Sequence, residues 1–278
     1  MTIANLEEVL MPAMEEHRAV AGLVVLGWED ANAYVKAADE TGIPIILQAG
    51  PGCRAHTPIP ILGKMFRYLA DQTEVPIVCH IDHGSSAEEC LEGIDSGFTS
   101  VMFDGSSLPI SENIKTTEHI VKKADAAGVS VEGEVGFVGY SEGSSSEFTL
   151  PEEAARFNNE TGATALAISI GNIHLKADKN IKIDFSALNQ IEKVTTLPLV
   201  LHGGSGISVN IRKYLARESR VSKFNIGTEL RMAFGNSLRK SVTENPNTFD
   251  RIKLLSPTVD AVKNKTIEVI KELNGKPE

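Results

Sequence analysis

Cysteine, aromatic residues and positive charge are all scarce in this chain of 278 residues, in which aromatic residues make up 5%. The three cysteines, Cys53, Cys79 and Cys90, lack the paired spacing of a disulfide framework or a cysteine metal site, which indicates a reducing compartment. Lysine and arginine number 27 against 37 aspartates and glutamates, so the net charge is −10. Such an acidic chain is not expected to bind nucleic acid, and an anionic ligand would need a local site.

Long apolar runs are missing as well. No stretch approaches the roughly 20 apolar residues that a membrane-spanning helix requires. Residues 1–18 include several glutamates and have neither the basic start nor the apolar core of a signal peptide. We therefore expect a cytoplasmic protein with no membrane partner.

Short apolar runs alternate with amphipathic helical segments along most of the chain. The apolar runs lie at 21–26, 45–48, 77–81, 100–103, 129–133, 165–169, 199–201 and 223–226. Eight buried strands, each followed by a helix, are the pattern of an α/β protein with a (β/α)8 TIM barrel, here as one domain spanning 1–278. A doubly wound open sheet is the alternative, because strands are easily miscounted from one sequence. An extra C-terminal helix is expected over 257–273.

One polar stretch interrupts this alternation. Residues 136–148 contain Gly136, Gly139 and Gly143 and a run of three serines, which do not suit the interior of a helix or strand. Loops of about this length in compact domains are commonly functional. We expect a mobile active-site loop there.

Chemically active side chains collect at the ends of the expected strands, where TIM barrels carry their active sites. These positions hold Asp82, His83, Asp104, Glu132, Glu134, Asn172, His174, His202 and Asn225. Three imidazoles with an open fourth position are the usual arrangement of catalytic zinc. His83, His174 and His202 are therefore expected to bind one metal ion, with three structural histidines as the alternative.

The remaining histidines have simpler interpretations. His17, His56 and His119 lie on expected helices or loops and are interpreted as surface residues. His80 lies inside an expected strand and is interpreted as a hydrogen-bonded core residue.

Two glycine-rich turns follow the last two expected strands. Their sequences are His202-Gly203-Gly204-Ser205-Gly206 and Asn225-Ile226-Gly227-Thr228. Glycines let backbone N–H groups close around an anion, hydroxyls add donors, and the start of the following helix adds the positive end of its dipole. We interpret the two turns as a phosphate site, although one such turn alone is more often an ordinary loop.

Together these motifs resemble those of the zinc-dependent class II ketose-phosphate aldolases, a family that includes fructose-bisphosphate and tagatose-bisphosphate aldolases. The resemblance extends over about residues 44–229. Its most specific parts are Ile81-Asp82-His83-Gly84, Glu134-Val135-Gly136 with Glu142, Ile170-Gly171-Asn172-Ile173-His174, Leu201-His202-Gly203-Gly204-Ser205-Gly206 and Asn225-Ile226-Gly227-Thr228-Glu229.

The resemblance implies reversible retro-aldol cleavage of a ketose 1-phosphate or 1,6-bisphosphate to dihydroxyacetone phosphate and an aldehyde. It implies that the three histidines bind Zn²⁺ or another divalent ion, and that Asp82 exchanges the proton of the hydroxyl beside the breaking bond. Glu142 would move a proton on and off the carbon of the three-carbon product, and Asp104 and Glu134 match a possible second metal position. Dihydroxyacetone phosphate would be held by Gly203, Gly204, Ser205, Asn225, Ile226, Gly227 and Thr228. Family members are commonly homodimers or homotetramers.

The sequence departs from the family on the aldehyde side. Leu175 stands where a glycine is typical, which implies a different local geometry, and Leu23 and Val24 stand where a Phe-Asn pair is common. The second expected strand also lacks the usual serine near its end. Arg54 and Lys265 are the expected contacts for a distal phosphate or other acidic group, with surface exposure as the alternative.

Three other functions remain open at this point. The first is the same reaction on a modified ketose 1-phosphate with a non-phosphate acidic tail. The second is a Schiff-base aldolase, which needs a lysine at a strand end, whereas Lys223 opens its expected strand. The third is a non-catalytic barrel that binds metal and phosphate.

Overall fold

Eight parallel strands close into a barrel in the computed structural model, which describes residues 2–141, 143 and 145–275. The order around the barrel is β4-β3-β2-β9-β8-β7-β6-β5, and β5 pairs with β4 to close it. The strands are β2 (Val20–Val24), β3 (Ile45–Ala49), β4 (Ile77–Gly84), β5 (Ser100–Phe103), β6 (Ser130–Val135), β7 (Ala165–Ile168), β8 (Leu199–Leu201) and β9 (Val221–Ile226). The predicted TIM barrel is confirmed, and pairing between its first and last strands, β2 and β9, excludes the open sheet.

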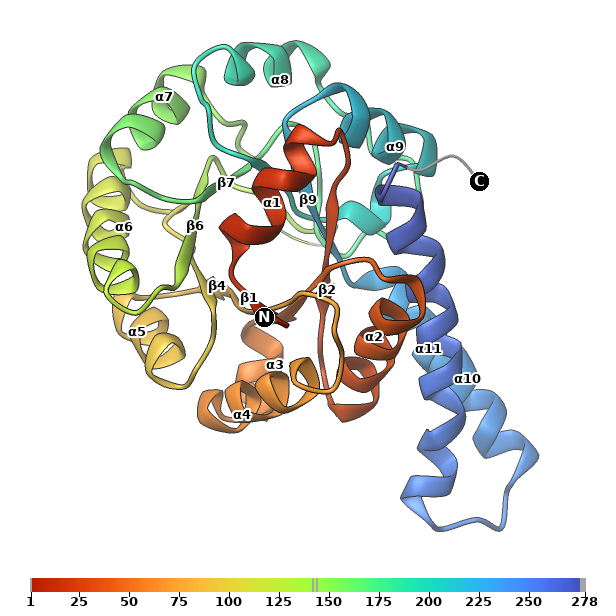
Figure 1. Ribbon diagram of the computed structural model, residues 1–278. Coiled ribbons are helices and arrows are strands. Elements are labelled where there is room, and N and C mark those ends of the chain that lie inside the picture. Colours follow the sequence, from red (N-terminus) through yellow and green to blue (C-terminus); the bar gives the residue numbers. More distant parts are fainter. Residues whose placement is uncertain (1, 142, 144, 276–278) are drawn as a thin grey trace.

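Helices surround the barrel (Figure 1). They are α2 (Trp28–Thr41), α3 (Pro51–His56), α4 (Ile59–Ala70), α5 (Ala87–Asp95), α6 (Ile110–Asp125), α7 (Pro151–Glu160), α8 (Phe185–Glu192), α9 (Val209–Glu218) and α10 (Thr228–Glu244). Local sequence sets their ends: the side chain of Ser86 accepts a hydrogen bond from the Glu89 N–H to cap α5, and Gly42 ends α2 in the left-handed conformation. The eight predicted β-α units are all present, whereas the short helix α3 was not predicted.

The N-terminal segment closes one end of the barrel. The short strand β1 (Ile3–Ala4) pairs with the start of β4, and α1 (Leu6–Glu15) lies across the opening (Figure 1). Reciprocal capping bonds between Asn5 and Glu8 start α1. Its apolar side chains pack on an apolar layer inside the barrel, formed by Val20, Ile46, Val78, Met102, Ala165, Ala167 and Val200. We call this layer the floor. It separates α1 from the opposite end of the barrel.

Helices α10 and α11 (Arg251–Leu273) form a hairpin that projects beyond the ring of helices (Figure 1). The last helix begins before its predicted start at Pro257, because the side chain of Asp250 accepts a hydrogen bond from the Ile252 N–H and caps α11 there. Near the tip of the hairpin, Phe249 and Ile252 are 94% and 76% exposed.

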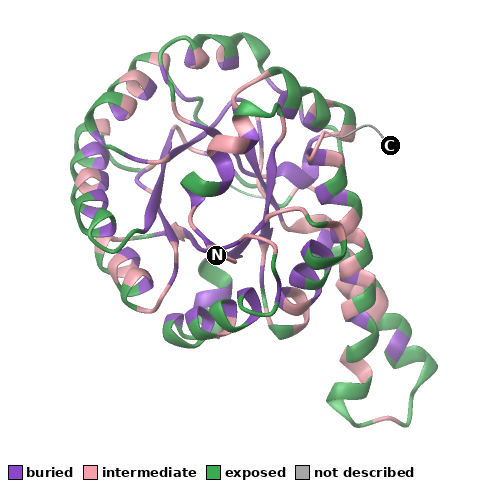
Figure 2. Ribbon diagram, in the orientation of Figure 1, coloured by how far each residue is buried: buried purple, intermediate pink, exposed green. Residues whose placement is uncertain are grey.

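The barrel strands are buried and the outer faces of the helices are exposed (Figure 2). The three cysteines are free and buried, as the sequence indicated. Among the residues that the structure describes, no helix combines the length and the apolarity that crossing a membrane requires.

Candidate metal and substrate site

Beyond the apolar floor, the interior of the barrel holds polar side chains. Buried polar residues come from β3, β4, β6 and β9 and from the segment after β8, and include Gln48, His80, Asp82, Glu132, Glu134, His202, Lys223 and Asn225. A polar group taken out of water is costly unless it finds a partner. The partners of these side chains therefore define the site.

An ion pair lies in the centre of the barrel. Lys223 Nζ is 2.6 Å from Glu132 Oε2, and both side chains are fully buried. Lys223 Nζ is also 3.5 Å from His80 Nε2, and the other ring nitrogen of His80 is 2.8 Å from Ser100 Oγ. His80 is thus a hydrogen-bonded core residue, as predicted. Lys223 lies beneath the site, held by Glu132.

His83, His174 and His202 converge from three strand ends. The ring centroids of His83 and His174 are 5.1 Å apart, those of His83 and His202 are 4.5 Å apart, and those of His174 and His202 are 5.5 Å apart. One nitrogen from each ring lies within 4.8 Å of the other two. In contrast, His17, His56 and His119 are exposed, as predicted.

The backbone at His83 explains how two successive residues reach the site. Successive side chains of a strand normally point to opposite faces, yet Asp82 and His83 both line the same cavity. His83 has a φ of 53°, and the pairing of β4 with β5 shifts register between Ile81 and Gly84. This irregularity turns the His83 side chain back toward the barrel mouth.

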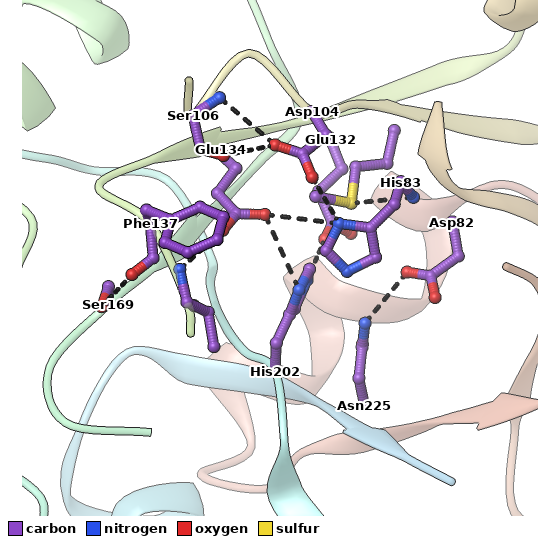
Figure 3. A network of polar contacts seen from close by, with 12 residues as sticks. Asp82, His83, Asp104, Ser106, Glu132, Glu134, Phe137, Ser169, His202 and Asn225 are labelled. Atoms are coloured by element: carbon purple, nitrogen blue, oxygen red, sulfur yellow. Dashed lines mark hydrogen bonds and ion pairs between the residues drawn. The ribbon is translucent and has the colours of Figure 1, made fainter. Parts of the chain in front are cut away.

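Two of the imidazoles have a carboxylate close to one nitrogen and no hydrogen bond to a described residue at the other, although Glu134 Oε2 lies 3.7 Å from His202 Nδ1 (Figure 3). His83 Nδ1 is 2.7 Å from Asp104 Oδ2, and His202 Nε2 is 3.3 Å from Glu132 Oε1. The opposite nitrogens, His83 Nε2 and His202 Nδ1, are buried without a hydrogen-bond partner in the described part of the chain. A divalent metal ion would satisfy both nitrogens, while the carboxylates fix the orientation of the rings. These residues therefore fit such an ion.

A second group of ligating atoms adjoins the first and consists of His83, Asp104 and Glu134. Glu134 Oε2 is 3.7 Å from a nitrogen of His83 and 3.7 Å from a nitrogen of His202. It has no hydrogen-bond partner among the described residues. Asp104 and Glu134 thus lie beside the imidazoles, where a second metal position was expected.

The environment shifts pKa values in opposite directions within the site. Burial lowers the pKa of His174 to about 4 and that of His202 well below its usual range, which keeps both imidazoles neutral at pH 7. Burial acts in the same direction on His83, but nearby carboxylates, Asp82 foremost, raise its pKa to about 9. Burial raises the pKa of Glu134 to about 8. At pH 7 the cluster therefore has neutral imidazoles at His174 and His202 and an ionised carboxylate at Asp104, whereas His83 and Glu134 carry protons that a bound cation would displace.

Two amides hold the Asp82 carboxylate. Its Oδ1 accepts hydrogen bonds from Gln48 Nε2 at 2.8 Å and from Asn225 Nδ2 at 3.0 Å (Figure 3 shows the second). Its Oδ2 lies beside Gly50, on the side of the cavity. Burial raises the pKa of Asp82, but the imidazoles, His83 foremost, outweigh it and lower this pKa below its usual value. The carboxylate is therefore ionised at pH 7 and can accept a proton at Oδ2.

Gly22 in β2 makes room for these amides. A Cβ atom at this position would lie 1.8 Å from Gln48 Oε1 and 3.0 Å from Asn225 Oδ1. Any side chain would therefore displace the amides from Asp82. Sequence reasoning did not single out Gln48, although a glutamine within an apolar strand was a signal.

The cavity above these groups lies at the carboxyl ends of the strands. It is lined by Asp82, His83 and His174 and by residues of both glycine-rich turns, namely Gly203, Ser205, Asn225, Gly227 and Thr228. The Ser205 hydroxyl accepts a hydrogen bond from the Glu229 N–H at 3.3 Å, which joins the two turns at the start of α10. Among the predicted phosphate contacts, Gly204 and Ile226 do not line the cavity, because they pack against each other beneath it.

The rest of the cavity lining is mostly apolar and includes Val24, Leu26, Cys53 and Leu175. One arginine, Arg231 of α10, also lines the cavity, and its guanidinium carbon lies 3.9 Å from the position of a Cβ atom on Gly227, beside the second glycine-rich turn. Sequence reasoning missed Arg231, although it follows Thr228 by about one helical turn and so shares a face with the start of the helix. Leu175 has a φ of 58°, a conformation that glycine adopts more easily. The backbone at Leu175 thus has a conformation that suits glycine, and the difference from the family lies in the side chain rather than in the backbone.

Arg54 and Lys265 do not form the expected anion contact. The Arg54 guanidinium is turned inward, where it donates to backbone carbonyls at the ends of β3 and β4 and forms an ion pair with Glu89. Lys265 pairs with Glu268 on α11, and neither Arg54 nor Lys265 lines the cavity. These two predictions are corrected: the cation at the cavity is Arg231.

Part of the 136–148 loop lies against the cavity. The ring of Tyr140 stacks on His174 and lines the cavity, and the Gly139 carbonyl accepts a hydrogen bond from the His174 N–H at 2.8 Å. Glu142, the predicted proton-transfer residue of the loop, lies outside the described residues.

Comparisons with known proteins find similarity along nearly the whole chain. The family model "Fructose-bisphosphate aldolase class-II" matches residues 4–277. A fructose-bisphosphate aldolase from Geobacillus stearothermophilus is 34% identical, with 99% of this chain and 98% of that protein covered. A 6-phospho-5-dehydro-2-deoxy-D-gluconate aldolase from Bacillus licheniformis is also 34% identical, with 99% and 96% covered. The crystal structure of the YdjI aldolase from Escherichia coli K12 has a TM-score of 0.83 at 30% identity, with 98% of this chain and 97% of that chain covered.

Proposed function

Since the chain belongs to the class II fructose-bisphosphate aldolase family, we propose that it cleaves a ketose 1-phosphate or 1,6-bisphosphate reversibly to dihydroxyacetone phosphate and an aldehyde. Membership makes the protein an aldolase, a carbon–carbon lyase, and implies a phosphorylated sugar as substrate. The observation that carries the proposal is the pair of buried nitrogens without a hydrogen bond to the described residues, His83 Nε2 and His202 Nδ1, close to the Asp82 carboxylate that two amides hold in place.

His83, His174 and His202 would hold Zn²⁺ or another divalent ion, in keeping with the general metal dependence of the family. When bound, such an ion stabilises the negative charge that cleavage leaves on the ketone fragment. Asp104 would keep the His83 ring oriented through Nδ1, and Glu132 would keep the His202 ring oriented through Nε2. Asp104 and Glu134 would supply oxygens for a second metal position.

Asp82 would accept the proton of the substrate hydroxyl beside the bond that breaks. Its lowered pKa keeps it ionised, and the amides of Gln48 and Asn225 hold Oδ1 so that Oδ2 stays on the side of the cavity. A base held in one place serves both directions of the reaction, because the same oxygen returns the proton during synthesis.

The two glycine-rich turns would hold the phosphate of dihydroxyacetone phosphate. Gly203, Ser205, Gly227 and Thr228 line one part of the cavity, and α10 begins there with the positive end of its dipole. Gly204 and Ile226 would support the turns from beneath.

The 136–148 loop would move over the bound substrate and exclude water during proton transfer. Glu142 would exchange the proton on the carbon of the three-carbon product. The sequence of the loop and its resemblance to the family support both roles.

Arg231 would contact the phosphate held by the second glycine-rich turn, because its guanidinium carbon lies 3.9 Å from the position of a Cβ atom on Gly227. Arg231→Met is expected to raise the KM for a ketose 1-phosphate by about 10–100-fold, because a hydrogen bond to a charged group contributes roughly 1.5–3 kcal/mol. The KM for the matching ketose 1,6-bisphosphate should rise to a similar extent. Coupled assays of dihydroxyacetone phosphate release measure both values. Arg239→Met, further along α10, is the matched control, and an unchanged KM for the ketose 1-phosphate would contradict the assignment.

An acidic tail in place of the second phosphate is the second candidate. One relative of equal identity is named for a substrate that combines a phosphate with a gluconate.

A retro-aldol screen tests the reaction itself. The panel contains ketose 1-phosphates, ketose 1,6-bisphosphates and a phosphorylated keto-gluconate, and dihydroxyacetone phosphate is the product measured for each. We expect cleavage that a chelator abolishes and Zn²⁺ restores. Cleavage that survives the chelator, with substrate trapped on the protein by borohydride, would instead favour the Schiff-base mechanism, for which the buried and ion-paired Lys223 is poorly placed.

We also propose that the protein forms a homodimer or homotetramer through the projecting hairpin of α10 and α11. The exposed side chains of Phe249 and Ile252 near its tip are typical of surfaces that another chain covers. Sedimentation velocity measures the assembly mass.

A further inference from the structure

The three clustered imidazoles differ in what holds each ring. His83 and His202 each place one nitrogen against a carboxylate, that of Asp104 or Glu132. Within the described part of the chain, neither ring nitrogen of His174 has a hydrogen bond or ion pair, and the contacts of its ring are aromatic. Metal-binding histidines almost always direct their second nitrogen to a polar partner. Among the described residues, the contacts at the His174 ring itself are those with Tyr140, His83 and His202.

Tyr140 lies on the face of the His174 ring. The two ring centroids are 4.9 Å apart, and the ring planes are inclined by 25°. Backbone bonds fix this register: the His174 N–H donates to the Gly139 carbonyl at 2.8 Å, and the Ser141 N–H donates to the His174 carbonyl at 3.1 Å. The loop backbone thus sets one ring flat against the other.

A second attachment ties the same part of the loop to the strand ends. Ser146 Oγ accepts a hydrogen bond from the Gly139 N–H at 3.0 Å and donates to the Asn172 carbonyl at 3.4 Å. The Asn172 amide in turn donates to the His202 carbonyl at 3.1 Å. Hydrogen bonds therefore connect the backbone next to Tyr140 to the segments that carry His174 and His202.

We propose that Tyr140 is a positioning residue for His174, in which stacking on the imidazole replaces the hydrogen bond that orients each of the other two rings. The inference rests on the proposed metal site. Stacking limits the tilt of the imidazole and leaves both of its nitrogens free, so one remains available to the ion.

Removal of the Tyr140 hydroxyl distinguishes a stacking role of the ring from a hydrogen-bonding role of the hydroxyl. Tyr140 is 43% exposed, and its hydroxyl has no hydrogen bond to another described residue. Removing the hydroxyl alone should leave the stack intact. Tyr140→Phe therefore keeps the proposed interaction, whereas Tyr140→Leu removes it.

The test is the rate at which zinc-loaded protein loses its metal to excess chelator, followed with a zinc-sensitive dye and without substrate. Tyr140→Leu should lose zinc about tenfold faster, at the lower end of the roughly 10–100-fold cost of removing a partner from a ligating histidine. Tyr140→Phe should match the unmodified protein. Tyr214→Leu, which removes a surface aromatic contact with Phe185 at 5.6 Å, is the matched control and should also match.

A second measurement reports the geometry of the ligands. The visible absorption of the Co²⁺-loaded protein should change in Tyr140→Leu and remain the same in Tyr140→Phe. Unchanged zinc loss in Tyr140→Leu would overturn the inference, and so would Tyr140→Phe behaving like Tyr140→Leu, since the hydroxyl would then be responsible. A protein that holds zinc but cleaves no sugar contradicts the proposed reaction alone, whereas a protein that takes up no divalent ion overturns both.

Discussion

Asp82→Asn should remove most of the sugar cleavage and leave metal content unchanged. Asparagine keeps the size of the side chain and an oxygen for the Gln48 and Asn225 amides, but it cannot accept the hydroxyl proton. General base catalysis contributes about 10²–10⁴-fold, so we expect kcat to fall by at least about 10²-fold. Steady-state release of dihydroxyacetone phosphate measures this loss, and elemental analysis of the purified variant measures bound metal.

Two further variants calibrate the Asp82 result. Gln48→Leu keeps the carboxylate but removes one of its two amide donors, so a smaller loss of roughly tenfold is expected from the weakened positioning. Asp125→Asn, an exposed carboxylate at the end of α6, should have no effect. If Asp82→Asn cleaved sugar as fast as Asp125→Asn, another group would have to be the base.

Lys223→Met should lower the free energy of unfolding by about 3–5 kcal/mol, because it leaves the buried Glu132 carboxylate without its cationic partner. The two side chains are fully buried and 2.6 Å apart in the unmodified protein, so water cannot replace the lost partner. Urea denaturation of the metal-free protein measures the change. Lys240→Met, which removes an exposed pair with Glu244, should cost less than about 1 kcal/mol.

The double variant Lys223→Met with Glu132→Leu separates folding from function. Removing both charges should recover most of the lost stability, since a buried ion pair is often replaced by apolar residues at little cost. Metal affinity should not recover, because His202 Nε2 loses its carboxylate partner. If Lys223→Met were as stable as Lys240→Met, Glu132 would have to gain another partner or become protonated in the variant.

The barrel was predictable because its signals are local. Each strand is a short buried run, each helix follows directly, and His83, His174 and His202 stand at strand ends where the fold brings residues together. The doubtful point was closure, which depends on pairing between the first and last strands of the barrel, β2 and β9, and leaves no pattern in either strand. Boundaries set by single side chains were also missed, as the capping of α11 by Asp250 illustrates.

The clamp on Asp82 could not be predicted, because it joins residues far apart in the sequence. Gln48 in β3 and Asn225 in β9 meet only because both strands flank β2, where Gly22 leaves space between them. Sequence also gives the charge of a side chain without its direction. Arg54 follows a strand as expected, yet it turns to backbone carbonyls, and the cation that reaches the cavity is Arg231.

The barrel has an apolar floor and a charged upper half. The charges that the proposed reaction requires lower thermostability, so turnover and thermostability conflict. Positions such as Glu132, Lys223 and Asp82 bury charges that hydrophobic residues of similar volume would replace with a gain in stability. A directed-evolution screen that rewards heat resistance alone would therefore enrich inactive barrels. Engineering for industrial temperatures should instead begin at the opposite end, where α1 and the floor can be repacked without touching the chemistry.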